Sequence, residues 1–342
     1  MDKVNAGIIG LGRFGRLHLK VLEELPNCEV VAVAEKDQNT LDRVKEDHDI
    51  AKAFTDAEHV INDPEIDSIH VITDENSHGE FVKKILKKSK HVFVEKPLAT
   101  SYGDGKEIGE LATSMNKIVM VGNINRFSQP YISIKNNVRN NHLGEIATIR
   151  VKRDFSKKWF ENFGKRIHPV YESGIHDIDL LLWYVKSKCE RVFAVEKYTS
   201  RQRYPDLFSA ILTFENGVVA SLESAWLLPE GGPKNLVENL ELDGTINGQI
   251  EVIGEKGTAN FDLLNPGYSI WTEEKTLYPE LTLWPYDNEK VSGAIRSEIE
   301  HYINQVLSGV ESSVSPLPDS IDALKISEAI QKSAETKMPI SL

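Results

Sequence analysis

The sequence predicts an α/β protein with two domains: a doubly wound parallel sheet at the N-terminal end, then an α+β domain with a large, mostly antiparallel sheet. Three observations support this prediction. Up to residue 122, short apolar runs alternate with helical segments of about 10–15 residues, which is typical of a parallel sheet covered on both faces. Later, longer alternating runs predominate, and Asn216-Gly217, the strongest short hairpin signal, joins two of them. The length of 342 residues also exceeds what one hydrophobic core usually spans.

We expect the domain boundary between residues 122 and 123, which gives domains 1–122 and 123–342. The strands expected in the first domain cover residues 4–9, 29–34, 53–54, 68–72, 92–94 and 118–122. Those expected in the second domain cover residues 147–155, 191–198, 207–214 and 218–226, with shorter ones near 250–261 and 269–272. The helices expected there include residues 130–140, 294–307 and 319–336.

A glycine-rich turn follows the first expected strand and opens a helix. Its sequence, Gly10-Leu-Gly12-Arg-Phe-Gly15, has the GxGxxG spacing in the context in which that motif binds a dinucleotide. Gly10 permits the tight turn, Gly12 lets the backbone approach a pyrophosphate, and Gly15 lets the helix pack closely on the strand. The helix N-terminus offers free N–H groups to the phosphates. The first domain is therefore predicted to be a Rossmann dinucleotide-binding domain.

The second expected strand ends in an acid that bears on the choice of cofactor. Glu35 lies 20 residues after Gly15. A carboxylate at this position would bind the hydroxyls of the adenosine ribose and repel a 2′-phosphate. The sequence therefore favours NAD. The next residue, Lys36, could pair with a 2′-phosphate, so NADP stays open as an alternative.

A lysine is presented at the end of another expected strand. The run Val92–Val94 stops at Glu95-Lys96-Pro97, where the proline cannot continue a central strand. Ligands bind outside the carboxyl ends of the strands in open α/β sheets, so this lysine would lie beside the cofactor. From the spacing alone, an ordinary surface lysine at a strand end is the simpler interpretation.

An acid and a histidine are spaced for one helix face in the second domain. Glu172 and His176 are four residues apart, just before or within a helical apolar stripe that runs to Val185. A carboxylate beside an imidazole orients the ring and raises its basicity, which suits a general base. A purely structural hydrogen bond is the alternative. No HxH, HExxH or Cys/His cluster is present, so we expect no metal site.

The composition argues against several other classes of protein. The net charge is −12, which disfavours a nucleic-acid surface, and the lysine cluster at 83–90 fits a solvated helix face. Cys28 and Cys189 are far apart and form no disulfide framework. No apolar run approaches the ~18 residues that span a membrane, and the N-terminus lacks the pattern of a secretory signal. We therefore expect a cytoplasmic protein that binds neither nucleic acid nor membrane.

Together these segments resemble the Gfo/Idh/MocA oxidoreductases, the family of glucose–fructose oxidoreductase and myo-inositol dehydrogenase. The resemblance extends over essentially the whole chain. The matching segments are GLGRFG at 10–15, VAVAE at 31–35, VITDENSH at 71–78, VEKPLA at 94–99, NINRF at 123–127, and ESGIHDIDLL at 172–181, together with Ser327–Ile330 and Ser333 near the C-terminus.

The resemblance implies oxidation of a secondary alcohol of a sugar or cyclic polyol, with hydride transfer to nicotinamide C4. It implies that Lys96 binds the reacting hydroxyl and helps to move its proton, that His176 is the base, and that Glu172 is its acidic partner. It also implies a homodimer or homotetramer formed through the open face of the C-terminal sheet.

The expected cofactor contacts are Gly10, Gly12, Arg13, Phe14, Gly15, Glu35, Lys36, Thr73, Asp74, Asn76, His78, Glu95, Lys96, Asn123 and Arg126. The expected substrate contacts are Lys96, Arg126, Trp159, Glu172, Ser173 and His176, with His168 and Trp226 as further pocket candidates. The segments expected to be substrate-selecting loops are 156–171 and 227–238.

The chain departs from the family pattern at two places. Relatives usually carry Asp where Glu172 stands, and Thr-Pro-Asn where this chain has Thr73-Asp74-Glu75-Asn76. The role expected for Asn76 therefore has less support than that of Thr73. Two other hypotheses remain open: a dinucleotide-binding sensor or regulatory protein without turnover, and a lyase or glycosidase that uses bound NAD transiently.

Overall fold

The chain folds into two compact units in a computed structural model, which describes residues 2–233, 244–264, 269–271, 276–277, 281–287 and 290–342. The first, here called the Rossmann unit, contains Met1–Phe127 and Leu283–Ile321. The second, the sheet unit, contains Ser128–Thr282 and Asp322–Leu342. No helix in the described part of the chain is long and apolar enough to cross a membrane.

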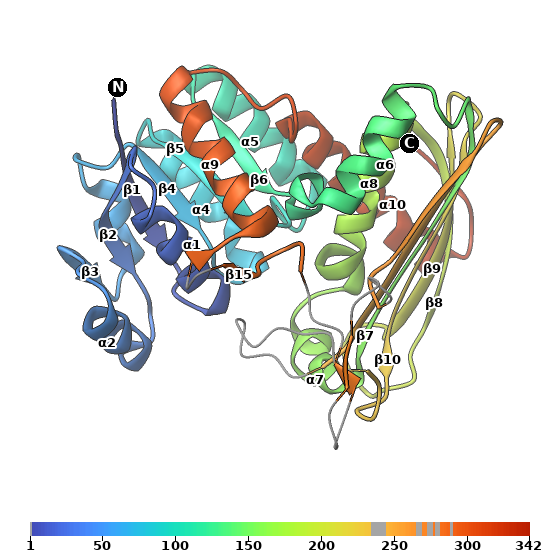
Figure 1. The fold of residues 1–342 in the computed structure, drawn as a ribbon, viewed down its shortest axis with the longest axis horizontal. Helices are drawn as coiled ribbons and strands as arrows, with labels where there is room; N and C mark the ends of the chain where they lie inside the picture. Colours follow the sequence, from blue (N-terminus) through green and yellow to red (C-terminus); the bar gives the residue numbers. More distant parts are fainter. Residues whose placement is uncertain (1, 234–243, 265–268, 272–275, 278–280, 288–289) are drawn as a thin grey trace. The chain divides into compact units, whose positions relative to one another are not determined.

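The Rossmann unit is built on a six-stranded sheet with the order β3-β2-β1-β4-β5-β6 (Figure 1). Its strands are β1 (Val4–Ile9), β2 (Cys28–Ala34), β3 (Lys52–Phe54), β4 (Ser68–Val71), β5 (His91–Glu95) and β6 (Val119–Gly122). All neighbouring pairs are parallel, which confirms the predicted doubly wound sheet. The strand order reverses between β1 and β4, and ligands bind at such a switch point in open α/β sheets.

Helices connect these strands, and side-chain caps fix where several of them begin. They are α1 (Arg13–Glu23), α2 (Gln38–Asp47), α3 (Ala57–Asn62), α4 (Glu75–Lys87), α5 (Tyr102–Met115) and the 3₁₀ turn η1 (Ile124–Phe127). Asp37 caps α2 by accepting a hydrogen bond from the Thr40 N–H at 2.8 Å, and Ser101 caps α5 in the same way. The predicted alternation of strands and helices is thus present from β1 to β6.

The chain returns to the Rossmann unit late in the sequence, with residues Leu283–Ile321. Helix α9 (Gly293–Ser308) packs against α1, β1 and η1, and its side chains Ile295, Ile299 and Tyr302 are fully buried. Arg296 on its exposed side forms an ion pair with Glu24. The apolar periodicity of α9 predicts a buried helix face, but it carries no information about which sheet that face covers.

The sheet unit contains a seven-stranded sheet with the order β12-β11-β7-β10-β9-β8-β17. Its strands are β7 (Ile146–Ser156), β8 (Cys189–Lys197), β9 (Leu207–Phe214), β10 (Val219–Leu228), β11 (Ile246–Gly254), β12 (Thr258–Asp262) and β17 (Ile340–Ser341). Only the β7–β10 pair is parallel, so the predicted, mostly antiparallel sheet is confirmed. The Asn-Gly hairpin joins β9 to β10, and Gly217 there has a φ of +86°.

Helices cover one face of this sheet. They are α6 (Gln129–Arg139), α8 (Ile175–Val185) and the second part of α10 (Leu317–Thr336). Helix α8 contacts β7 and β10, and the Ser333 hydroxyl of α10 accepts a hydrogen bond from the Ala194 N–H of β8. Two short antiparallel strand pairs are also described: β13 (Ile270–Trp271) with β14 (Thr276–Leu277) in the sheet unit, and β15 (Tyr286–Asp287) with β16 (Lys290–Val291) in the Rossmann unit.

One segment expected to be a loop is mostly helical. Residues 156–171 contain α7 (Lys157–Arg166), because Phe160 and Phe163 lie on one face of the helix and pack on Trp226. Of the other expected loop, 227–238, the first two residues belong to β10 and residues 234–238 lie outside the described ones.

Candidate functional site

The glycine loop between β1 and α1 has the geometry of a dinucleotide cradle. Gly10 has a φ of +95°, and a Cβ there would lie 2.3 Å from the Ile72 carbonyl oxygen. A Cβ on Gly15 would lie 2.0 Å from the Gly10 oxygen, whereas one on Gly12 would have no atom of the described residues within 4 Å. Gly10 and Gly15 are therefore required by close packing, and Gly12 keeps open space at the N-terminus of α1. This arrangement fits a bound pyrophosphate.

Glu35 is fixed beside this loop. One carboxylate oxygen accepts a hydrogen bond from the Leu11 N–H at 2.7 Å, and the other accepts one from the Asp37 N–H at 3.0 Å. The carboxylate therefore stands at the end of β2, next to the glycine turn, where a Rossmann fold receives the adenosine ribose. Lys36 is exposed, and its Nζ lies 3.8 Å from a carboxylate oxygen of Asp74.

Two residues of the glycine loop have different surroundings. Arg13 is exposed at the start of α1. Phe14 is partly buried and packs edge-on against the Trp284 ring, with the ring centroids 5.5 Å apart. The roles expected for Arg13 and Phe14 in cofactor binding stay predictions.

The loop after β4 is joined to the loop after β5. The Thr73 hydroxyl lies 2.7 Å from that of Ser77 in the first turn of α4. His78 is buried, and its ring nitrogens lie 2.9 Å from the Thr73 oxygen and 2.7 Å from the Pro97 oxygen. This histidine therefore holds the two strand tips together. Asn76 lies in the first turn of α4, which begins at Glu75.

Lys96 lies at the expected place in the sheet. It follows β5 directly, at the carboxyl end of the strand that neighbours β4, and it is partly buried. Its own N–H donates a hydrogen bond to a carboxylate oxygen of Glu95 at 3.2 Å. The glycine loop, Thr73 and Lys96 thus follow the consecutive strands β1, β4 and β5 at one edge of the sheet. Positively charged and polar groups at this edge are typical of a nucleotide site.

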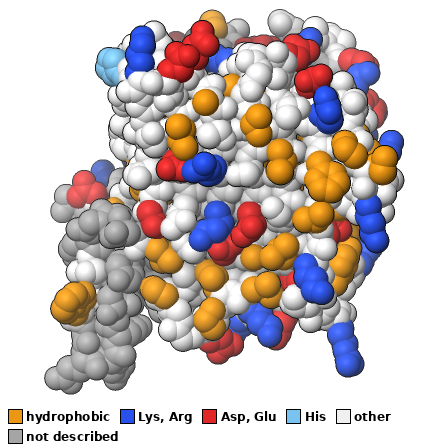
Figure 2. Space-filling view, turned by 90° about the vertical axis from the view of Figure 1, so that its right-hand side faces the viewer, with side chains coloured by type: hydrophobic (Ala, Val, Ile, Leu, Met, Phe, Trp, Pro, Cys, Tyr) orange, Lys and Arg blue, Asp and Glu red, His pale blue; other side chains and the backbone are white. Residues whose placement is uncertain are grey.

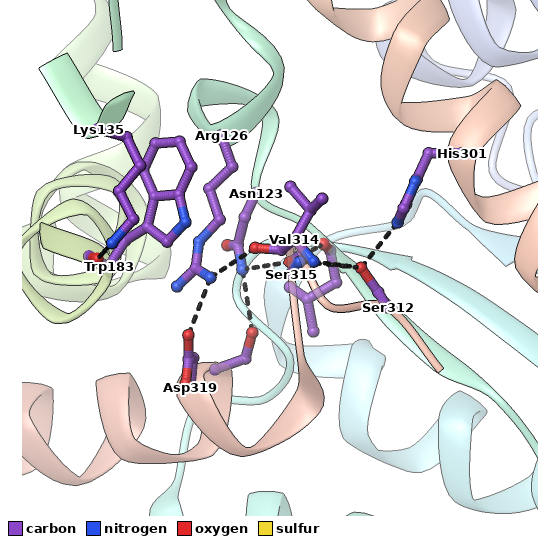
Figure 3. A network of polar contacts seen from close by, with 11 residues as sticks. Asn123, Arg126, Lys135, Trp183, His301, Ser312, Val314, Ser315 and Asp319 are labelled. Atoms are coloured by element: carbon purple, nitrogen blue, oxygen red, sulfur yellow. Dashed lines mark hydrogen bonds and ion pairs between the residues drawn. The ribbon is translucent and has the colours of Figure 1, made fainter. Parts of the chain in front are cut away.

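Asn123 and Arg126 contact a distant segment within the Rossmann unit (Figure 3). The Asn123 amide donates hydrogen bonds to the Ser315 and Ser320 hydroxyls at 3.1 and 3.0 Å. The Arg126 guanidinium, only 1% exposed, donates to the Val314 oxygen and to Asp319, both at 2.8 Å. Both side chains therefore join the end of β6 and η1 to the chain before and within α10. Their expected roles with cofactor or substrate stay predictions.

Glu172 and His176 are the accessible members of a buried stretch in the sheet unit. Glu172 lies in a π-helical turn (Val170–Gly174) that runs directly into α8, and such turns are frequent at functional sites. From Val170 to Leu181, every residue is buried except Glu172 and His176. The two side chains therefore share the accessible side of this element, as the four-residue spacing predicts.

Buried contacts fix the rotation of α8 about its axis. The Asp177 carboxylate binds the Arg153 guanidinium of β7 in a bidentate pair, with an Nη2–Oδ1 distance of 2.6 Å. The adjacent charge of Asp177 raises the pKa of Arg153 above its ordinary value, even though burial opposes its charge. This ion pair was not anticipated; its only signal in the sequence is a charged residue within an apolar helical stretch.

Four expected substrate or pocket residues make structural contacts within the sheet unit. Ser173 is buried, and its hydroxyl lies 2.9 Å from the Pro169 oxygen and 2.8 Å from the Ser224 hydroxyl. Trp226 is buried and stacks on Phe155, and Trp159 is partly buried against these two rings. His168 is buried, and its Nε2 lies 2.8 Å from a Glu196 carboxylate oxygen. Trp226 and Ser173 are thus part of the core. For Trp159 and His168, a contact with substrate stays a prediction.

The described residues contain no group of three or more His, Cys, Asp or Glu side chains placed to hold a metal ion. The candidate functional residues from the sequence fall into two sets. Lys96 and the glycine loop belong to the Rossmann unit, and Glu172 and His176 belong to the sheet unit.

Comparison with known proteins agrees with this arrangement. Residues 4–123 match the model of an oxidoreductase family with an NAD-binding Rossmann fold, and residues 131–260 match that of the GFO/IDH/MocA C-terminal domain. A myo-inositol 2-dehydrogenase of Thermotoga maritima is 26% identical over 342 residues, with 98% of each chain covered.

Solved structures show the same fold. A myo-inositol 2-dehydrogenase from Lactobacillus plantarum superposes with a TM-score of 0.84 at 23% identity, and a scyllo-inositol dehydrogenase from Lactobacillus casei with bound NAD(H) and scyllo-inositol superposes with 0.81 at 20% identity. Each comparison covers 99% of both chains. Because the two family models together match well over half of the sequence, the chain belongs to the Gfo/Idh/MocA family of oxidoreductases with an NAD-binding Rossmann fold.

Proposed function

We propose that this protein is an NAD-dependent dehydrogenase that oxidises a secondary alcohol of a cyclic polyol of the inositol class. The observation that carries the proposal is the placement of the glycine loop, Thr73 and Lys96 after three neighbouring strands at the switch-point edge of the sheet. Similarity to proteins named inositol dehydrogenases supports the polyol as substrate.

In this proposal each residue has a defined task. Bound NAD supplies the hydride acceptor. Lys96 donates a hydrogen bond to the oxygen of the reacting alcohol, and the His176 imidazole accepts the hydroxyl proton as the hydride leaves the same carbon. Glu172, four residues before His176, orients the imidazole. The products are a ketone, NADH and one proton, so atoms and electrons balance.

The preference for NAD over NADP is assigned to Glu35. Its carboxylate is held rigidly by the Leu11 and Asp37 N–H groups, which are part of the phosphate loop and of the turn after β2. A fixed negative charge at this place would repel a 2′-phosphate and accept hydrogen bonds from ribose hydroxyls. The positive charge of Lys36, whose Nζ lies 3.8 Å from an Asp74 carboxylate oxygen, keeps NADP as a weaker ligand.

We also propose a homodimer or homotetramer that forms through the open face of the sheet unit. Phe193, Val195, Ile211 and Val219 are exposed on the adjacent strands β8, β9 and β10. Figure 2 shows apolar side chains between charged ones on this face. Exposed apolar groups gathered on a sheet face are typical of a protein interface.

We also propose that the protein is located in the cytoplasm. The free thiols of Cys28 and Cys189 are compatible with this location.

The test is the formation of NADH from a panel of inositol stereoisomers and sugars, followed by absorbance. Lys96→Ala and His176→Asn should each lower kcat by about 10²- to 10⁴-fold, as expected for loss of a proton-transfer group. Lys106→Ala, exposed on α5, and His142→Asn, exposed after α6, serve as matched controls and should not change the rate.

Three outcomes distinguish the hypotheses. NADH that accumulates with one polyol class supports the dehydrogenase. Cleavage of a substrate that requires NAD but yields no net NADH would identify a lyase or glycosidase instead. Tight binding of NAD with no turnover of any alcohol would identify a sensor.

A further inference from the structure

A chain of three ionisable side chains lies beneath the tip of β5 in the Rossmann unit. It consists of His70 on β4, His18 on α1 and Glu95 at the end of β5. Both histidine side chains are fully buried, and their Nδ1 atoms lie 3.2 Å apart. The His18 Nε2 lies 3.4 Å from Glu95 Oε1, and the Glu95 side chain is only 13% exposed. The proposed hydride and proton transfers make no use of these two imidazoles.

An aromatic cage surrounds the two imidazoles. The His70 ring stacks on Phe93 with centroids 5.0 Å apart, and the Tyr302 ring meets both edge-on. The Tyr302 hydroxyl forms a hydrogen bond with the Ser68 hydroxyl, and the two oxygens are 2.5 Å apart. Burial, with a smaller contribution from His18, lowers the pKa of His70 well below its usual range. His70 is therefore a neutral ring at working pH.

The positions of the hydrogens follow from these distances. A neutral imidazole has one N–H donor and one acceptor nitrogen. If the His18 Nε2 lacked a hydrogen, its lone pair would face a carboxylate oxygen, and two acceptors would repel each other in a buried site. The His18 Nε2 therefore carries the hydrogen on the side of Glu95, in a charge–dipole contact at 3.4 Å that lacks the alignment of a hydrogen bond. In the neutral form of His18, Nδ1 is then an acceptor, and the His70 Nδ1–H donates to it.

The backbone beside Glu95 is adapted to this contact. Gly122 on β6 is the direct sheet neighbour of Glu95, and a Cβ on it would lie 2.8 Å from Glu95 Oε1. The absence of a side chain at residue 122 lets the carboxylate fold inward against β6, toward His18. The other carboxylate oxygen accepts the Lys96 N–H at 3.2 Å. Both oxygens of Glu95 are thus directed by the protein.

We propose that His18 is a positioning residue for the strand tip that carries Lys96. The His18 Nε2–H faces the Glu95 carboxylate across 3.4 Å as a polar contact, and His70, 3.2 Å from the other ring nitrogen, sets the tautomer of His18. The Glu95 carboxylate, fixed on one side by His18 and on the other by the Lys96 N–H, then sets the backbone from which the Lys96 side chain leaves. The catalytic consequence rests on the proposed function, because it requires Lys96 to act on the alcohol.

The first test needs no turnover. In protein labelled with ¹⁵N-histidine, tautomers are distinguished by the ¹⁵N shifts of the ring nitrogens, and the two rings can be assigned by their contacts with Phe93 and Tyr302 protons. The expected result is a protonated Nε2 and an unprotonated Nδ1 for His18, with the reverse for His70. An unprotonated Nε2 on His18 would overturn the proposal, whether or not the protein turns over any polyol.

The second test separates the polar contact of His18 with Glu95 from the packing of the His18 ring. The amide nitrogen of glutamine can approach the place of His Nε2, whereas that of asparagine corresponds to Nδ1. His18→Asn should lower kcat ~10- to 100-fold, the cost of a misplaced catalytic group, while the dissociation constant of NAD changes less than about threefold. If His18→Asn lowers kcat 100-fold, His18→Gln should lower kcat tenfold or less. Equal losses in both variants would show a packing role and overturn the proposal.

A third variant acts mainly on the Glu95 carboxylate, although a Cβ at residue 122 would also lie 3.2 Å from the Phe93 ring. Gly122→Ala places a methyl group against Glu95 Oε1, so it should lower kcat as His18→Asn does, again with NAD affinity retained. Full activity of Gly122→Ala would contradict the proposal. If the parent protein forms no NADH from any alcohol, the proposed function fails, and the NMR result still decides the contact between His18 and Glu95.

Discussion

At the scale of single residues, the Glu35 carboxylate at the end of β2 governs the choice of cofactor in the proposed function. Its distance from the glycine motif predicts a ribose-binding acid, and the structure adds that the Leu11 and Asp37 N–H groups already hold the carboxylate. Replacement by alanine would remove both a charge and two structural acceptors. Glu35→Gln is the sharper change, because the amide oxygen can still accept the Leu11 N–H.

We expect Glu35→Gln to improve binding of NADP relative to NAD by about tenfold, since loss of one repulsive charge at close range is worth ~1 kcal/mol or more. The dissociation constants of both cofactors, measured by the quenching of protein fluorescence, check this. Glu29→Gln, exposed at the other end of β2, is the matched control. An unchanged ratio for Glu35→Gln would remove Glu35 from cofactor selection.

His91 leads to a prediction about acid stability. It is partly buried at the start of β5, where its Nδ1 accepts the Ile118 N–H at 3.1 Å. Burial, aided by the charge of Lys117 and opposed by Asp67, lowers the pKa of His91 from 6.5 to about 4. Between these values the unfolded chain binds more protons than the folded one, so the free energy of unfolding falls as the pH falls from 6.5 toward 4.

His91→Asn should reduce this acid sensitivity, because the amide oxygen can accept the Ile118 N–H but does not titrate. Urea denaturation of parent and variant at pH 7 and pH 5 measures the effect. Between pH 7 and pH 5, the free energy of unfolding should fall less for the variant than for the parent. A difference independent of pH would show that His91 does not titrate as described.

At the scale of elements, periodicity predicted most strands and helices, and β9 (Leu207–Phe214) has the bounds expected from the sequence. The π-helical turn before α8 could not be predicted in this way. Its wide turn depends on tertiary contacts, such as the close approach of Gly174 to Phe208, where a Cβ would lie 2.6 Å from the ring. The helix α7 was missed for a similar reason: its apolar face is short and is identified by the Trp226 cluster that it covers.

The orientation of α8 depends on the buried pair of Arg153 and Asp177. Asp177→Asn would leave the Arg153 charge buried without its partner, so it should lower the free energy of unfolding by about 3–5 kcal/mol. The double variant Arg153→Met with Asp177→Leu should be less destabilised, because apolar residues of similar volume often replace a buried ion pair at little cost. Chemical denaturation compares the three proteins. Equal stability of parent and Asp177→Asn would contradict this account.

At the scale of the whole molecule, local patterns identify elements but not their partners. The contact between Ser68 and Tyr302 joins residues 234 positions apart, and it places α9 on the Rossmann sheet. No spacing rule in the sequence anticipates it, and the same holds for the contact of His18 with His70. Gly10, Glu35 and Lys96 could be identified from the sequence because their roles depend on short spacings at strand ends. Arg153 and Gly122 could not be identified in this way, because each contacts a residue far away in the chain, Asp177 and Glu95 respectively.

The open face of the sheet unit leads to a prediction for the assembly. Ile211 is 52% exposed and lies opposite Phe193, itself 41% exposed, on the neighbouring strand. If this face forms an interface between copies, a charge at its apolar centre would have to be desolvated there without a partner. Ile211→Lys should therefore convert a dimer or tetramer to smaller species in sedimentation velocity. Val310→Lys is the matched control, because Val310 is similarly exposed on the Rossmann unit. The proposed interface is wrong if the parent sediments as a monomer, or if Ile211→Lys keeps the parent's mass.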